Sequence, residues 1–159
     1  MAPKRPVPSF RPATPQDRAV LGEMIREYYA HDRHEIDDLV IESALDSALV
    51  PNQHIRIWII EVAGETAGYV AVAIGFTIEA GGHDGFLDEL YLREPYRGAG
   101  IGRRAVEFAI DACPGLGIRR ISLEVERHNE RARRLYEDIG FFAHDRILMS
   151  HWTDGRDRT

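Results

Sequence analysis

The stretch that decides the fold runs over residues 86–112 and reads FLDELYLREPYRGAGIGRRAVEFAIDA. Its first part, residues 86–92, is mostly apolar and predicts a strand with two acids, Asp88 and Glu89, in the middle. Residues 101–112 carry apolar side chains at helical spacing and predict an amphipathic helix. The turn between these two elements is rich in glycine. The stretch therefore predicts a strand, a tight turn and a helix.

The glycine turn points to a phosphate-bearing ligand. Glycines let the backbone of residues 98–102 turn tightly and aim several N–H groups at the start of a helix, where the helix dipole is positive. Arg97 and Arg103 flank the turn and could add charged hydrogen bonds. A P-loop would need Gly-Lys-Ser/Thr, which is absent, and a dinucleotide fingerprint would need glycine where Arg103 stands. Both of these nucleotide motifs are excluded.

The chain before this stretch predicts three further strands and two helices. A proline and an acid near residue 15 predict the start of the first helix, and Pro51 ends the second. Runs of Ile, Val and Trp separated by Ala63-Gly64-Glu65 predict a β-hairpin. The strands are expected at 7–11, 55–62 and 67–78, and the helices over residues 18–30 and 39–49.

The chain after residue 112 predicts one more strand, helix and strand. The strand is expected over 118–126. Asn129 is placed to cap a helix with an apolar stripe, and Gly140 is placed to end it. A closing strand is expected from Phe141 towards Trp152. The alternation of elements predicts an α/β protein in which a mixed sheet carries helices on both faces.

Length and composition favour one folded domain over residues 1–159, with flexible ends at about 1–5 and 154–159. The chain has 44% hydrophobic and 29% charged residues, which are ordinary globular values. No apolar run is long enough to span a membrane, and no secretory signal precedes the domain, so we expect a cytoplasmic protein without membrane partners. The single cysteine, Cys113, is expected to be a small buried residue on a helix.

The charge is unevenly distributed along the chain. The net charge of −6 weighs against nucleic acid as a partner. Residues 1–92 hold 7 Lys and Arg against 15 Asp and Glu, whereas residues 93–159 hold 13 against 11. This asymmetry is either chance at the surface or a sign that the basic half holds a phosphate-bearing ligand and the acidic half a cationic one.

Together, the acidic strand 86–92, the Arg97-x-x-Gly-x-Gly turn and the helix with Asn129 and Tyr136 resemble the GNAT superfamily of acyl-CoA-dependent N-acyltransferases. The resemblance is strongest over residues 87–141. It implies a single GNAT-like domain, with a central mixed, mostly antiparallel sheet, a splayed parallel strand pair and helices on both faces. It also implies acetyl-CoA as co-substrate, with no metal.

The resemblance further implies which residues hold coenzyme A. Backbone groups of the acidic strand would pair with the pantetheine arm as an added strand does. Amides of the glycine turn would hold the pyrophosphate, and Asn129 would contact the cofactor, although it could equally be a plain helix cap. The cofactor-binding residues expected on this basis are Leu90, Tyr91, Leu92, Arg97, Gly98, Ala99, Gly100, Ile101, Gly102, Arg103 and Asn129.

The transfer requires a neutral amine, so a base is needed, because an amine with a pKa near 10 is about 0.1% neutral at pH 7. Asp88 and Glu89 are the candidates, and strand alternation sends them to opposite faces unless a bulge intervenes. We favour Glu89, with Asp88 as the alternative. A free N–H near Leu90 or Tyr91 would stabilise the oxyanion. By resemblance, Tyr136 would protonate the leaving sulfur; otherwise it is a core tyrosine.

The acceptor is expected to be a small-molecule amine, preferably cationic, because the first half of the chain is acidic. Side chains expected to contact it are Tyr28, Asp32, Glu35, His83 and Glu126. The charged run from His31 to Asp38 is otherwise a solvated helix junction, and Tyr28, Tyr29 and Trp58 either line an aromatic wall or pack in the core.

Three alternatives remain open at this point. The acceptor could be a protein N-terminus or lysine, which would need an open groove. The domain could bind coenzyme A as a regulatory module without catalysing transfer. A sheet edge could also support a homodimer, which is compatible with catalysis.

Overall fold

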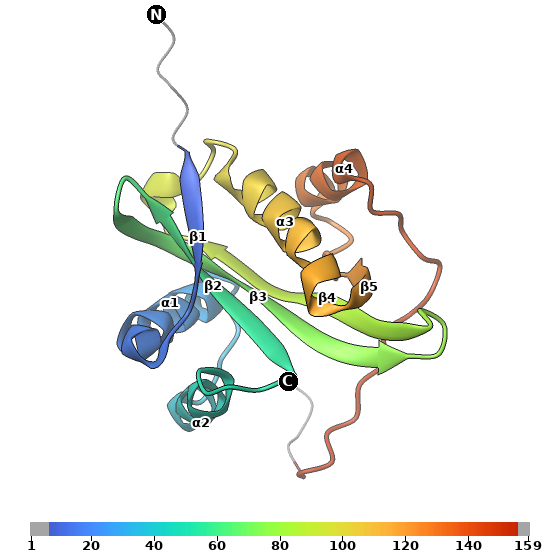
Figure 1. The fold of residues 1–159 in the computed structure, drawn as a ribbon, viewed down its shortest axis with the longest axis horizontal. Coiled ribbons are helices and arrows are strands. Elements are labelled where there is room, and N and C mark those ends of the chain that lie inside the picture. The colour runs from blue at the N-terminus through green and yellow to red at the C-terminus, as the bar shows by residue number, and fades with distance from the viewer. Residues whose placement is uncertain (1–6, 156–159) are drawn as a thin grey trace, which may run out of the picture. The chain divides into compact units, whose positions relative to one another are not determined.

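In the computed structural model, residues 7–155 are described, and they form two compact units, within residues 1–126 and 127–159. The first unit is a five-stranded sheet in the order β1-β2-β3-β4-β5 with helices on both faces (Figure 1). Its strands are β1 (Pro8–Pro12), β2 (Ile55–Val62), β3 (Glu65–Thr77), β4 (Gly82–Leu92) and β5 (Ile118–Ser122). Its α-helices are α1 (Arg18–His31), α2 (Asp38–Ala48) and α3 (Ile101–Ala112).

The sheet is antiparallel except at its last pair. Neighbouring strands from β1 to β4 run antiparallel, whereas β4 and β5 run parallel. Their pairing ends at Phe86 with Ser122, although β4 continues to Leu92. The predicted strand over 118–126 therefore ends four residues early, because past Ser122 its backbone has no β4 partner. The predicted splayed parallel pair is confirmed by this register.

One face of the sheet packs against α1 and α2. Strand alternation places Ile59, Tyr69 and Tyr91 on this face, and the helices contribute their apolar stripes. The resulting buried cluster comprises Leu21, Met24, Ile41, Leu45, Ile59, Tyr69 and Tyr91. Burial of side chains of this size contributes about 1.5 to 3 kcal/mol each. This core fixes α1 against the strands that carry the predicted base.

The opposite face packs against α3. Phe108 of α3 stacks on Phe10 at a ring distance of 4.3 Å and meets Trp58 edge to face at 5.4 Å. Of the two interpretations of Trp58, packing in the core is therefore the one the structure shows, and Trp58 does not line a wall with Tyr28 and Tyr29. The reason is its position in β2, one residue from Ile59, which faces α1 and α2.

The second unit contains α4 (Glu130–Ile139). Asn129 caps it by accepting a hydrogen bond from the N–H of Ala132, at 3.1 Å, and Gly140 ends it with φ +111°. The closing strand predicted from Phe141 towards Trp152 is wrong, because no strand forms there. Its apolar residues come in blocks rather than at alternate positions, so they do not define a strand face.

Two expectations concern the ends and the membrane. The expectation of flexible ends falls mostly outside the described residues, in 1–5 and 156–159. Within the described part of the chain, none of the helices has the length and apolar character needed to cross a bilayer.

Candidate active site

Glu89 is held by two tyrosine hydroxyls from different elements. Tyr29, on α1, donates to Oε1 at 2.9 Å, and Tyr69, on β3, donates to Oε2 at 2.6 Å. The carboxyl group is largely surrounded by these rings, and this burial raises its pKa, although the two hydrogen bonds act in the opposite direction. A carboxylate with a raised pKa is a better proton acceptor than a solvated one. Glu89 therefore has the properties of a general base.

A β-bulge in β4 sets the direction of this side chain. Glu89 pairs with Ala71, but the next pair joins Val72 to Leu87, so Asp88 is an extra residue without a partner on β3. Bulges often re-aim side chains beside active sites. Glu89 faces α1 here, whereas Asp88 is exposed. The two acids thus have distinct environments, and only Glu89 has hydrogen-bond partners among the described residues.

Four aromatic residues form a tyrosine cluster around this carboxylate: Tyr28, Tyr29, Tyr69 and Tyr91. Ring centroids lie 5.2 Å apart for Tyr28 and Tyr29, 6.1 Å for Tyr28 and Tyr91, and 6.3 Å for Tyr69 and Tyr91. Burial raises the pKa of Tyr28 to about 12, and the charges of Asp32 and Glu89 act in the same direction. Burial and Glu89 also raise the pKa of Tyr29 and Tyr69. All these phenols keep their protons near neutral pH.

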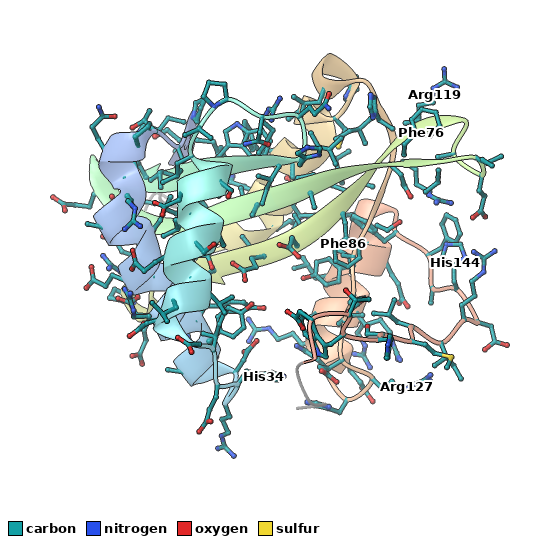
Figure 2. All side chains as sticks on the ribbon, turned by 90° about the horizontal axis from the view of Figure 1, so that it is seen from below. His34, Phe76, Phe86, Arg119, Arg127 and His144 are labelled. Atoms are coloured by element: carbon teal, nitrogen blue, oxygen red, sulfur yellow. The ribbon has the colours of Figure 1, made fainter. Side chains whose placement is uncertain are left out.

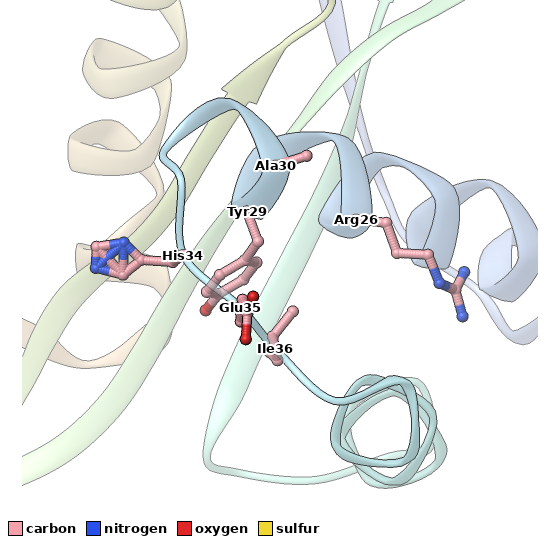
Figure 3. A pocket seen from close by; sticks show the side chains of 6 residues that line it. All are labelled: Arg26, Tyr29, Ala30, His34, Glu35 and Ile36. Atoms are coloured by element: carbon pink, nitrogen blue, oxygen red, sulfur yellow. The ribbon is translucent and has the colours of Figure 1, made fainter. Parts of the chain in front are cut away.

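A pocket of about 340 Å³ adjoins this cluster at the end of α1 (Figure 3). Figure 3 shows the Tyr29 ring projecting from α1 toward His34 and Glu35. The pocket is lined by Arg26, Tyr29, Ala30, His34, Glu35 and Ile36. Of these residues, only Tyr29 also bonds Glu89.

The charge of this pocket is negative. The guanidinium of Arg26 is already paired with Asp38 at 2.6 Å and with Glu42 at 2.8 Å. By contrast, Glu35 has no ion pair with any described residue. An uncompensated carboxylate in the wall suits a cationic group.

A second polar cluster lies under the end of β4 and was not predicted from the sequence. Tyr91 donates its hydroxyl proton to Glu27, at 3.0 Å, and Arg93 binds the same carboxylate at 3.0 and 3.2 Å. These contacts join α1 to β4 on the far side of the base. Glu23 and Glu27 are charged residues four positions apart on a helix, a pattern typical of a solvated helix face. The sequence alone therefore does not indicate that Glu27 contacts β4.

The glycine turn has the geometry that its sequence predicted. Gly98 and Gly100 have φ of +78° and +82°, in the left-handed region that favours glycine, and α3 starts at Ile101. A Cβ at either position would meet nothing within 4 Å, so the turn is bordered by open space. The first N–H groups of α3 lack partners within the helix and are available to an anion.

The two arginines beside the turn are already engaged. Arg97 donates its Nε–H to the carbonyl of Leu92 at 2.7 Å, and its guanidinium lies 5.5 Å from the centre of the Tyr91 ring. Arg103 pairs with Glu107 at 2.9 Å along α3. Arg97 thus ties the turn to the end of β4.

The exposed edge of β4 lies next to this turn. Beyond Phe86, the strand pairs with β3 on one side only among the described residues. Leu90, Tyr91 and Leu92 belong to this half-paired segment. Such an edge can hydrogen-bond an extended ligand carrying amides.

The remaining predicted residues occupy several places. Tyr28 lies in the tyrosine cluster, Asp32 follows the last residue of α1, and Glu35 lines the pocket. Glu126 is exposed after the end of β5. In the second unit, Tyr136 is half-buried, which raises its pKa, and its ring lies 5.9 Å from Phe141.

His83 is not brought together with the base. Its ring packs on Phe76, which Figure 2 shows near the tip of the β3–β4 hairpin, away from α1 and α2. Six residues of strand separate His83 from Glu89, or about 20 Å. Asp84, beside it, is bound by Arg120 at 2.8 Å. His83 therefore lies apart from the base, and its contact with an acceptor stays a prediction.

Two other groups can be placed plainly. Within the part of the chain that is described, no three His, Cys, Asp or Glu side chains are grouped so that they could hold a metal ion. Cys113 is buried at the end of α3, where its thiol donates to the carbonyl of Ala109 at 3.1 Å.

Comparison with known proteins identifies the family and the fold. Residues 19–141 match the model of the acetyltransferase (GNAT) family. Two similar Bacillus subtilis proteins are the uncharacterized N-acetyltransferases YycN, 42% identical over 67 residues, and YhfO, 28% identical over 133 residues. N-alpha-acetyltransferase 30 of Saccharomyces cerevisiae is 35% identical over 71 residues. The matches cover 42%, 84% and 45% of this chain, and 42%, 89% and 40% of those proteins.

Solved structures share the whole fold. The Integron Cassette Protein HFX_CASS3, from a salt-marsh metagenome, superposes with a TM-score of 0.79 at 28% identity, over 91% of this chain and 90% of that one. A predicted acetyltransferase from Clostridium acetobutylicum, solved with acetyl-CoA, has a TM-score of 0.76 at 18% identity, over 95% of this chain and 100% of that one.

Proposed function

Because the chain belongs to the acetyltransferase (GNAT) family, we propose that it transfers an acetyl group from acetyl-CoA to a primary amine bound beside Glu89. The observation that carries this proposal is the buried carboxylate with two tyrosine donors, next to a negatively charged pocket. The half-paired edge of β4 and the glycine turn fit the donor. The edge of β4 can pair with the extended, amide-bearing pantetheine arm of acetyl-CoA, and the glycine turn can bind its pyrophosphate.

In this proposal one residue of the chain accepts the proton of the substrate amine and another donates a proton to the leaving thiolate. Glu89 takes the proton of the ammonium, so that the nitrogen lone pair can attack the thioester carbonyl. A backbone N–H near Leu90 or Tyr91 stabilises the oxyanion. Tyr136 donates its phenolic proton to the departing sulfur, for which its raised pKa keeps it protonated. Asp88 is the second candidate base: burial raises its pKa as well, but it is the unpaired residue of the bulge, and the two tyrosine hydroxyls bond Glu89 instead.

For the acceptor, we propose a small cationic amine. Glu35 supplies an uncompensated negative charge in the pocket wall, and residues 1–92 carry a net charge of −8. A protein N-terminus is the second candidate, because the yeast relative is an N-alpha-acetyltransferase by name. A pocket that opens at the surface of α1 is compatible with either acceptor.

Release of coenzyme A thiol from acetyl-CoA tests the proposal. The acceptor panel comprises polyamines, aminoglycosides, amino acids and peptides with free N-termini. We expect acceptor-dependent release by the wild type. Glu89→Gln should lower kcat by about 10²-fold or more, the usual size of a general-base effect. Unchanged turnover in Glu89→Gln would reject this base, and binding of coenzyme A without release for any acceptor would favour the regulatory module.

The pocket assignment has a matched control. Glu35→Gln should raise KM for a cationic acceptor about two- to fivefold, the size of an exposed ion pair, and leave kcat nearly unchanged, since it removes a charge from the wall without touching Glu89. Glu65→Gln removes the same charge at the exposed start of β3 and should leave KM unchanged. Equal KM values for wild type and Glu35→Gln would place the acceptor elsewhere.

A further inference from the structure

The two hydrogen bonds to Glu89 come from different elements, α1 and β3. Tyr69 is 1% exposed in the core and holds Oε2. Tyr29 is partly exposed, lines the pocket and holds Oε1. Both carboxylate oxygens therefore already face phenol protons. Glu89 itself is not among the residues that line the pocket, so the Tyr29 hydroxyl links the pocket to this carboxylate.

We propose that Tyr29 is a catalytic proton relay, whose hydroxyl accepts the proton of the acceptor ammonium and passes its own proton to Glu89. This inference rests on the proposed function and adds a residue to it. It follows from the fact that Tyr29 is, among the described residues, the one that both lines the pocket and bonds Glu89. Tyr69, in this arrangement, is a positioning residue that keeps the carboxylate turned toward Tyr29.

The step balances without an added reactant. The N–H bond of the ammonium breaks as an O–H bond forms on Tyr29, and the original O–H bond of Tyr29 breaks as one forms on Oε1 of Glu89. The ammonium and the carboxylate become a neutral amine and a neutral carboxylic acid. Tyr29 is a neutral phenol before and after the step.

The electrostatics favour such an exchange over a free tyrosinate. Burial and the charge of Glu89 raise the pKa of Tyr29, and Tyr28 and Asp88 act in the same direction. A phenolate at this position would therefore be costly. Exchange of two protons in one step avoids it, because negative charge never accumulates on the phenol oxygen.

Matched isosteric variants test the relay. Tyr29→Phe and Tyr69→Phe each remove one hydroxyl bonded to Glu89, one on the pocket side and one in the core. We expect Tyr29→Phe to lower kcat by about 10²-fold, close to the loss in Glu89→Gln. The double variant Tyr29→Phe, Glu89→Gln should be no slower than Glu89→Gln alone, because residues that act as a unit are not additive. Tyr69→Phe should lose less than tenfold.

A second measurement separates a relay from a structural contact. An alkoxyamine acceptor, with a pKa below the assay pH, reaches the site already neutral. We expect the loss in Tyr29→Phe to shrink at least tenfold for this acceptor relative to an alkylamine. A structural role would lower both rates equally. Circular dichroism and coenzyme A titration calorimetry on each variant establish that it is folded and binds the donor.

The outcomes distinguish the two proposals. If Glu89→Gln were inactive while the kcat of Tyr29→Phe stayed within twofold of wild type, the relay would be overturned and Glu89 would remain the base. Full activity in Glu89→Gln would overturn the base and the relay together. An equal loss in Tyr29→Phe for alkoxyamine and alkylamine would also overturn the relay.

Discussion

Asp17 is a buried carboxylate at the start of α1, bound by Arg11 at 2.8 and 2.9 Å and by the N–H of Thr14 at 2.8 Å. The bonds to Arg11 lower its pKa from 3.8 to about 2, against the effect of burial. A lowered pKa in the folded state means that the carboxylate stabilises the fold above the unfolded pKa and loses this effect as pH falls. The shift corresponds to about 2 kcal/mol.

This gives a pH-dependent prediction. Asp17→Asn should lower the free energy of unfolding by about 2 kcal/mol at pH 7, and the difference from wild type should disappear as the pH falls from about 4 to 2. Urea titrations at several pH values measure it. Asp46→Asn removes an exposed partner of Arg18 and should change stability by less than about 1 kcal/mol. A constant difference across this pH range would contradict the assignment.

Single residues also show where sequence reasoning ended. Glu89 and the glycines could be predicted, because their types and spacing are distinctive. Tyr69 could not, because a tyrosine in an apolar strand looks like any core residue. Its functional relevance comes from the hydrogen bond between its hydroxyl and Glu89, which lies twenty positions away in sequence. Glu27 was missed for the same reason.

At the scale of elements, the order of strands and helices followed from periodicity up to α4. The bulge at Asp88 did not, because a bulge is a property of register between two strands and leaves no mark in one of them. Strict alternation would send Asp88 and Glu89 to opposite faces, but it does not apply across a bulge, and it cannot say which of the two acids meets α1. Similarly, β5 stops at Ser122, where its pairing with β4 ends, and that end of pairing is not written in the residues of β5 alone.

The pairing of β3 with β4 is unusually close at Gly68. A Cβ there would lie 2.0 Å from the carbonyl oxygen of Tyr91. Gly68→Ala must therefore push the two strands apart, and we expect a loss of about 1 to 3 kcal/mol in unfolding free energy. Coenzyme A affinity, measured by calorimetry, should fall as well, because Tyr91 lies on the proposed pantetheine edge.

A matched control lies in the same strand. At Gly75 the nearest atom to a Cβ is the Asp84 carbonyl oxygen at 3.7 Å, an ordinary contact. Gly75→Ala should be neutral or slightly stabilising, since alanine loses less conformational freedom than glycine on folding. If both variants were equally stable, the close approach at Gly68 would not restrain the strands.

For the whole molecule, a ligand that binds only the folded chain raises its stability. Coenzyme A at 100 times its Kd should add about 2.7 kcal/mol, which is a rise of several degrees in Tm. Gly100→Ala strains the turn at φ +82° and should reduce this rise, whereas Gly115→Ala, which has no such φ and open space around it, should not. Differential scanning calorimetry measures both. An undiminished rise in Gly100→Ala would place the pyrophosphate elsewhere.

The uneven charge is a second property of the whole chain. The acidic half contains the pocket and the proposed base, and the basic half contains the glycine turn. The composition of the chain could indicate this division into an acidic and a basic half, but it could not identify the acceptor. In the proposed function, recognition of a particular amine depends on a few atoms around Glu35 and Tyr29, whose positions come from the packing of α1 on the sheet.

The buried state of Cys113 determines how the chain will respond to the reagents that detect free thiols. It is the chain's single cysteine, it is 6% exposed, and burial raises its pKa, so the reactive thiolate is scarce in the native state. Coenzyme A released in solution should be labelled at once, and the protein only when it opens. One colorimetric trace can thus record turnover in its early phase and loss of the native fold in its late phase.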